Sequence, residues 1–186
     1  GWYTLPYWSL VNYNNDSSSY LVYFIEPIYP TEEQYRIGVK GILYYAERKD
    51  PASKVINHKL RSSIYHKLIL DGGYEALLVN EKGLITEGSR SNIFFLKGDI
   101  LYTAPDDMIL NGITRKHILD ICTLQHIEVL QKCVAADKIS GYDAVFMTGT
   151  SPMVLPFCYI DTIPFILGTP VFEKLRRLYI KRVEET

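Results

Sequence analysis

The sequence predicts an α+β (mixed α/β) domain, in which short strands come in groups and helices lie between and after them. Three observations support this class. Runs rich in β-branched and aromatic residues crowd the middle of the chain, two stretches there have helical spacing, and a third helical stretch closes the sequence. The strands are too many for a helical bundle, and 186 residues are enough for one domain with a sizeable core.

The first half of the chain alternates strand and helix signals. A helix is expected over 57–73, because Leu60, Ile64 and Leu68 recur at every fourth position and two glycines follow them. Turns are expected at 81–83 and 97–99, where a glycine stands among charged residues. The expected strands of this half are 20–28, 36–48, 74–80, 84–86, 91–97 and 100–104.

The second half begins with a helix expected over 113–125, introduced by Asn111 and Gly112. Two further strands are expected over 126–134 and 142–149. A last helix is expected over 170–183, with a proline in its first turn, where the missing N–H is tolerated.

Composition narrows the classes of function. The formal net charge is −1, so no overall field attracts nucleic acid or an anionic membrane, and no apolar run is long enough to span a bilayer. Three isolated cysteines without a C-x-x-C pair are typical of free thiols in a reducing compartment, which predicts a cytoplasmic protein. The four histidines lack close ligand spacing, so we expect no metal site.

Two charged residues have more than one local interpretation. Glu87, in the stretch GLITEGSRSNIFF, lies between two strand-like segments. It is either a turn acid that points to water or a carboxylate held inside the fold. Lys54 ends a loop just before the expected helix, and by itself it reads as an exposed lysine.

Two polar segments are candidates for binding an anion. A helix that begins at Ile113 and Thr114 offers unpaired N–H groups, a positive dipole end and a hydroxyl, after a glycine that permits close approach. Hydroxyl residues that include Thr150 and Ser151 cluster after the strand 142–149 and offer similar groups. The alternatives are an ordinary helix start and a plain turn.

Together these segments resemble a known family. Lys54-x-x-Asn57, YEALLVN, GLITEGSRSNIFFLKGDILYTAP and ILNGITR resemble the fold-type IV pyridoxal-phosphate enzymes, from about Thr31 to the C-terminus. That family includes branched-chain aminotransferases, D-amino-acid aminotransferases and aminodeoxychorismate lyase. The resemblance implies the large domain of the D-amino-acid aminotransferase-like fold, a mixed sheet curled toward a pseudo-barrel with helices outside. Residues 1–30 would be the interdomain segment and first strand, and 31–186 the domain that binds pyridoxal 5'-phosphate.

The resemblance also implies a role for each candidate residue. Lys54 would form the Schiff base with the cofactor and move protons at the substrate. Glu87 would pair with the pyridine nitrogen and keep it protonated. Backbone N–H groups and a hydroxyl at Ile113 and Thr114, with Thr150 and Ser151 as a second segment, would bind the phosphate. Finally, Arg48 would lie near the cofactor's phenolic oxygen.

The implied activity is transfer of an amino group between an amino acid and a 2-oxo acid, in a homodimer. An aminodeoxychorismate lyase on the same scaffold is the first alternative. The second is a non-catalytic remnant of the large domain, because we expect the chain to lack the small domain that supplies an arginine to the phosphate. The segment 1–15 contains no Arg, Lys or His, which counts against the D-amino-acid subfamily.

Overall fold

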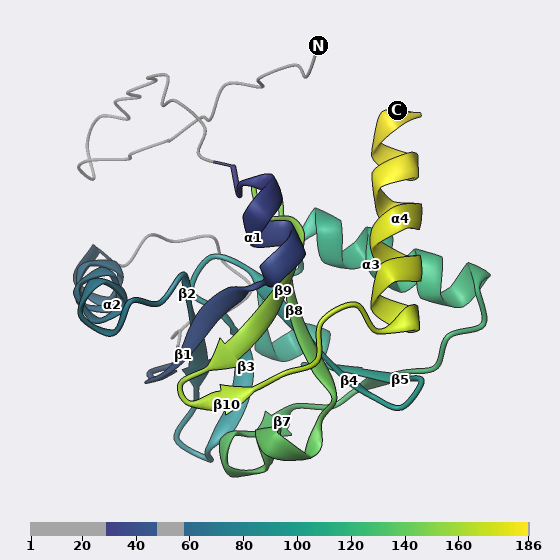
Figure 1. Cartoon of the computed structure of the whole chain (residues 1–186). Coiled ribbons are helices and arrows are strands. Elements are labelled where there is room, and N and C mark those ends of the chain that lie inside the picture. Colours follow the sequence, from purple (N-terminus) through teal and green to yellow (C-terminus); the bar gives the residue numbers. More distant parts are fainter. Residues whose placement is uncertain (1–28, 48–57, 186) are drawn as a thin grey trace, which may run out of the picture.

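The computed structural model describes residues 29–47 and 58–185, which form one mixed sheet with helices on its outside (Figure 1). The helices are α1 (Glu32–Ile37), α2 (His58–Asp71), α3 (Ile113–Leu124) and α4 (Pro170–Glu184), with 3-10 turns at Asp106–Met108 and Ala136–Gly141. The strands are β1 (Val39–Tyr45), β2 (Glu75–Val79), β3 (Leu84–Gly88), β4 (Asn92–Lys97), β5 (Ile100–Thr103), β6 (Val129–Gln131), β7 (Val134–Ala135), β8 (Ala144–Gly149), β9 (Met153–Ile160) and β10 (Ile163–Pro164).

Connectivity requires the sheet to curl. Its strand order is β6-β5-β4-β8-β9-β1-β2-β3-β7, with β10 beside β9 and with parallel and antiparallel neighbours mixed. The two strands at the ends of this order, β6 and β7, are separated in sequence only by Lys132 and Cys133. Two intervening residues span about 11 Å at most. The edges of a flat sheet of nine strands would lie about 38 Å apart. The predicted mixed sheet that curls toward a pseudo-barrel is therefore confirmed.

Both faces of the curled sheet are buried. One core consists mainly of strand side chains, among them Ile93 and Phe95 of β4. The alternate residues Phe94 and Leu96 point to the opposite face, where they join a second core with α3 and α4. A third core lies between α2 and the strands β1 and β2. The apolar run of β4 is thus explained by burial on both sides of the sheet.

Most predicted elements are confirmed, and the helix stops follow the expected chemistry. α2 ends at Asp71, and Gly72 after it has φ 63°, a left-handed conformation that glycine adopts without strain. α4 begins with Pro170 in its first turn, as expected. The short helix α1, which the sequence analysis does not predict, carries a capping box between Thr31 and Gln34. The strand expected over 20–28 lies outside the described residues.

Two expectations need correction. The single strand expected over 126–134 is wrong, because the chain turns after Leu130 and divides into β6, beside β5, and β7, beside β3. In addition, no strand is expected over 153–160, yet β9 lies in the middle of the sheet. Pro156 argues against a central strand, since it has no N–H to donate. Pairing with β1 begins only at Phe157, so Pro156 has a strand on one side, where it faces Phe146.

Candidate active site

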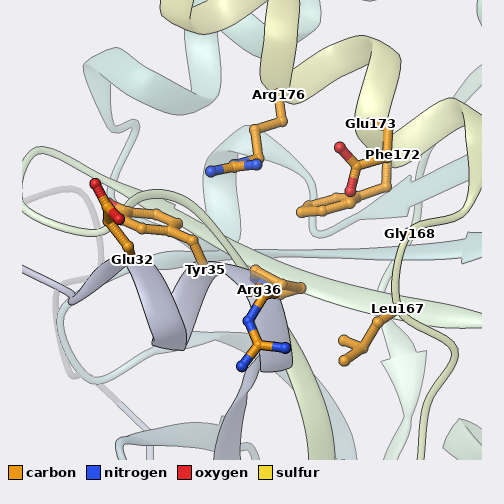
Figure 2. A pocket seen from close by; sticks show the side chains of 9 residues that line it. Glu32, Tyr35, Arg36, Leu167, Gly168, Phe172, Glu173 and Arg176 are labelled. Atoms are coloured by element: carbon orange, nitrogen blue, oxygen red, sulfur yellow. The ribbon is translucent and has the colours of Figure 1, made fainter.

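A surface pocket of about 370 Å³ lies between α1 and α4 but shares no residue with the predicted cofactor site. Figure 2 shows acidic and basic side chains of both helices around it. The guanidinium of Arg176 lies 5.1 Å from the ring centre of Tyr35, whose hydroxyl donates to the carbonyl of Pro152 at 3.1 Å. Burial raises the pKa of Tyr35 to about 12. This pocket is therefore built from packed helix side chains, and the predicted site lies elsewhere.

Glu87 is the centre of the predicted site, and it is buried. It belongs to β3, and only 3% of the residue is exposed. Its Oε2 accepts a hydrogen bond from the backbone N–H of Leu110 at 3.1 Å. The interpretation of Glu87 as a solvated turn acid is therefore wrong, and the carboxylate is held inside the fold.

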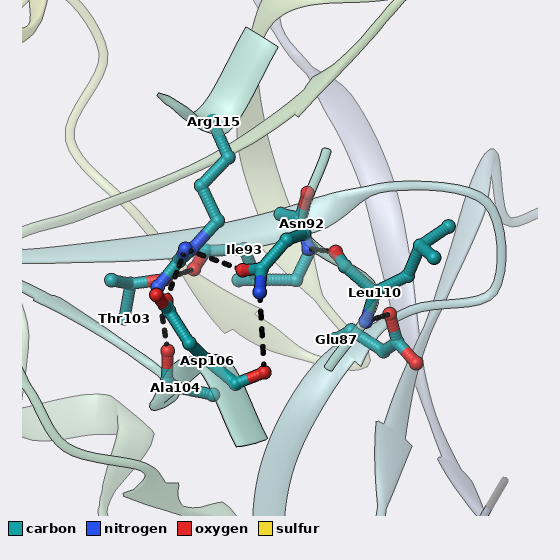
Figure 3. Close-up of polar contacts among 9 residues, drawn as sticks. Glu87, Asn92, Ile93, Thr103, Ala104, Asp106, Leu110 and Arg115 are labelled. Carbon is teal, nitrogen blue, oxygen red and sulfur yellow. Dashed lines mark hydrogen bonds and ion pairs between the residues drawn. The ribbon is translucent and has the colours of Figure 1, made fainter. Parts of the chain in front are cut away.

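Asn92 was not among the predicted site residues, but it completes this arrangement (Figure 3). It begins β4, is 5% exposed, and its Nδ2 donates to the carbonyl of Leu110 at 2.8 Å. Glu87 and Asn92, from two strands, thus bind the two backbone polar groups of one residue. Leu110 in turn stands three residues before the start of α3. A buried asparagine at the head of an apolar strand is the sequence signal that could have identified it.

The start of α3 has the features expected of an anion site. Its N-cap is Gly112, and no side chain caps the first turn. The first helical hydrogen bond runs from the N–H of Lys116 to the carbonyl of Gly112, so the N–H groups of the three residues between them point out of the helix end. The Ile113 side chain is exposed, whereas Thr114 is buried with its Oγ1 3.3 Å from the Tyr179 hydroxyl. A hydroxyl can make further hydrogen bonds, so this contact leaves capacity for a ligand.

Gly112 also has a structural role that the sequence analysis does not predict. A methyl group at this position would overlap Oδ1 of Asn92. The glycine therefore permits the approach of Asn92, whatever ligand the helix end binds.

Arg115, the last residue of the GITR motif, is a structural residue. It is 2% exposed. Its guanidinium donates to Asp106 Oδ1 at 2.7 Å, to Asn111 Oδ1 at 3.0 Å and to the carbonyl of Ala104 at 2.9 Å (Figure 3). These contacts tie α3 to the segment that carries Leu110.

The second hydroxyl segment lies beside the first. Asn92 pairs with Thr148 across β4 and β8, and the turn after β8 carries Thr150, which is exposed, and Ser151, which is half-buried. The Thr148 hydroxyl is buried, and within the described part of the chain it has no hydrogen-bond partner. Asn92 therefore adjoins three segments: the Glu87 carboxylate through Leu110, the start of α3 through Gly112, and the end of β8.

Two predicted residues, Lys54 and Arg48, lie outside the described ranges, and their roles stay predictions. Within those ranges, no three His, Cys, Asp or Glu side chains come together as a metal site would require. Likewise, no described helix has the length and apolar character needed to cross a bilayer.

Comparison with known proteins agrees with this geometry. The sequence profile described as "Amino-transferase class IV" matches residues 7–160. The chain belongs to the class IV aminotransferase family. It is 33% identical over 146 residues to a D-alanine aminotransferase of Bacillus licheniformis, an alignment that covers 77% of the chain and 51% of that relative. The chain thus spans about half the length of this curated relative.

Solved structures of the family have the same fold. A branched-chain amino acid aminotransferase of the organism abbreviated T.th., complexed with N-(5'-phosphopyridoxyl)-L-glutamate, matches with a TM-score of 0.74 and 30% identity over 81% of this chain and 53% of that one. A Legionella pneumophila protein provisionally named 4-amino-4-deoxychorismate lyase matches with a TM-score of 0.71 and 25% identity over 88% of this chain and 59% of that one. Class IV aminotransferases use pyridoxal 5'-phosphate as their cofactor.

The described residues fit this cofactor. Pyridoxal phosphate presents a ring nitrogen and a phosphate, which call for a carboxylate and for clustered N–H and hydroxyl donors. The chain has the buried carboxylate of Glu87 and the uncapped start of α3, and the segment held at Leu110 connects them.

Proposed function

We propose that the protein carrying this chain is a pyridoxal-phosphate-dependent aminotransferase that transfers an amino group between an amino acid and a 2-oxo acid. One observation carries this proposal. The buried Glu87 carboxylate binds the N–H of Leu110, and Leu110 leads directly into the uncapped start of α3. A carboxylate for the ring nitrogen and donors for the phosphate are therefore held at fixed positions relative to each other.

Each proposed residue has a definite task. When bound, the cofactor supplies an electron sink for the bond changes at the substrate α-carbon. Glu87 opposes a protonated ring nitrogen with its negative charge, and this interaction is strong because water is excluded around the carboxylate. The N–H groups at Ile113 and Thr114 orient the phosphate. Thr150 and Ser151 add donors from the turn after β8.

The remaining tasks fall to residues outside the described ranges. We propose that Lys54 binds the cofactor covalently through Nζ and carries protons to and from the substrate. Arg48 is proposed to lie near the phenolic oxygen. A homodimer, a cytoplasmic location and the division into 1–30 and 31–186 also belong to this proposal.

Covalent attachment of the cofactor tests the proposal. The purified chain, incubated with pyridoxal 5'-phosphate and reduced with borohydride, is expected to carry one cofactor on Lys54, as located by peptide mass spectrometry. Lys54→Ala abolishes this labelling. Lys59→Ala, an exposed lysine at the start of α2, is the matched control and retains it. A wild-type chain that binds no cofactor even in excess contradicts the proposal and favours the non-catalytic remnant.

The lyase is the second candidate, favoured by the match to the Legionella pneumophila protein. Both reactions use a proton-carrying lysine and an electron sink, so the described residues serve either one. Release of pyruvate from aminodeoxychorismate, measured beside amino transfer to 2-oxoglutarate, separates the two. Transfer without pyruvate release is the expected result.

A further inference from the structure

Glu75 is a second buried carboxylate, and none of the predicted roles includes it. It is the first residue of β2 and is 1% exposed. Its Oε1 accepts hydrogen bonds from the N–H of Ala76 at 2.9 Å, the N–H of Ser89 at 3.1 Å and the Ser89 hydroxyl at 2.5 Å. Its Oε2 accepts from the Ser91 hydroxyl at 2.9 Å. Three of the four donors therefore belong to the turn between β3 and β4.

That turn is closed around the Glu75 carboxylate. The N–H of Gly88 donates to the carbonyl of Ser91 at 2.7 Å. A methyl group on Gly88 would overlap Oγ of Ser91 and lie 3.2 Å from the carboxyl carbon of Glu75. Outside the turn, Arg90 Nη2 donates to the carbonyl of Tyr74, the residue before Glu75, at 3.1 Å. The turn is thus attached to the start of β2 by side chains on both sides of the backbone.

The two ends of this turn carry the residues that hold Leu110. Glu87 stands immediately before Gly88, and Asn92 immediately after Ser91. Their two hydrogen bonds to Leu110 both form only when the ends of the turn keep their spacing. Because Glu75 binds Ser89 and Ser91 together, its carboxylate controls that spacing.

We propose that Glu75 is a positioning residue, whose carboxylate fixes the Gly88–Ser91 turn and so sets Glu87 against the cofactor ring nitrogen. The part that concerns the cofactor rests on the proposed function. The part that concerns the turn and Leu110 is a property of the protein without cofactor. Glu75 itself contacts only its neighbour and the turn through the hydrogen bonds described, so it acts through Glu87.

Amide hydrogen exchange, followed by NMR in the cofactor-free chain, tests the first part. Glu75→Met removes all four acceptor contacts and keeps a similar side-chain length. The amides of Ser89 and Leu110 are expected to exchange about tenfold faster or more, while amides of β8 and β9 keep their rates. Ser91→Ala removes one hydroxyl only, gives a smaller increase at the same two amides, and serves if Glu75→Met does not fold. Unchanged exchange at Leu110 in both variants overturns the proposal.

The pH dependence of the absorption spectrum of the bound cofactor tests the second part. A displaced Glu87 stabilises the protonated ring nitrogen less, so the pH at which this nitrogen loses its proton falls by about one unit. Leu175→Ala, in the core between α3 and α4, is the control that lowers the melting temperature without contacting the turn. An equal shift in this control means that Glu75 acts only through global stability, which refutes the positioning role. If the wild-type chain binds no cofactor, the proposed function fails, whereas the exchange result still decides the role of Glu75 in the turn.

Discussion

The overlap between a methyl group at position 112 and Asn92 leads to a prediction about stability. Gly112 has φ −73° and ψ 145°, a conformation that alanine adopts without backbone strain. In the Gly112→Ala variant the new methyl group meets Oδ1 of Asn92. Asn92 can avoid it only by giving up its hydrogen bond to the carbonyl of Leu110, 2.8 Å long. The clash therefore costs no more than the loss of this contact.

The magnitudes follow from burial. Asn92→Ala leaves a partly buried carbonyl without its donor, which lowers the free energy of unfolding by about 2 kcal/mol. Gly112→Ala lowers it by a similar amount, about 2 kcal/mol, because the weaker helix cap and the stiffer unfolded chain roughly offset each other. In the double variant the methyl group no longer meets an amide. The combined loss is expected to be about 2 kcal/mol instead of the additive sum of about 4 kcal/mol.

Urea unfolding followed by far-ultraviolet circular dichroism measures all four proteins at one pH and temperature. The difference between the observed and additive losses is the coupling free energy, expected to be about 2 kcal/mol. Additivity within about 0.5 kcal/mol would show that Asn92 and Gly112 act independently, which refutes the reasoning. A glycine-to-alanine change at Gly141, where an added methyl has open space around it, is the control for the change of residue type.

Three other outcomes are expected. Arg115→Lys lowers the free energy of unfolding by about 2 to 3 kcal/mol, since one ammonium cannot replace a guanidinium with three acceptors, whereas the exposed Arg177→Lys is neutral in the same urea assay. Gly88→Ala lowers the melting temperature, and adding Ser91→Ala, which removes the overlapping hydroxyl, restores part of the loss in calorimetry. Cys122→Ala reduces the loss of stability between about pH 8 and pH 10, as measured by urea unfolding at both values.

The Cys122 prediction depends on a definite sign. Burial raises the pKa of its thiol to about 12, from an ordinary value of 9.0. The unfolded chain therefore loses this proton at a lower pH than the folded chain, and stability falls as the pH rises above about 9. This thiol contributes a loss of about 1 kcal/mol between pH 8 and pH 10, which the alanine variant lacks. An identical loss in both proteins contradicts the assignment.

Local spacing was enough to predict most elements of this protein. Helical periodicity followed by glycine placed α2, and alternating or continuous apolar runs placed β2 to β5 and β8. Such patterns involve residues two to four positions apart, whose relation survives in any fold. The same local information predicted one strand over 126–134 and none at β9, because strand partners decide both cases. Only the curled sheet separates β6 from β7, and only the register with β1 accommodates Pro156.

The candidate site divides in the same way. The sequence by itself determined the family, through the motif that contains Glu87 and the helix start at Ile113. Whether Glu87 was a turn acid or a buried carboxylate was decided by Leu110, which lies 23 residues further along the chain. The parts played by Asn92 and Glu75 were likewise decided by tertiary contacts. A polar side chain gains its role from the donors and acceptors that enclose it, and here the curled sheet and the segment before α3 bring those groups together.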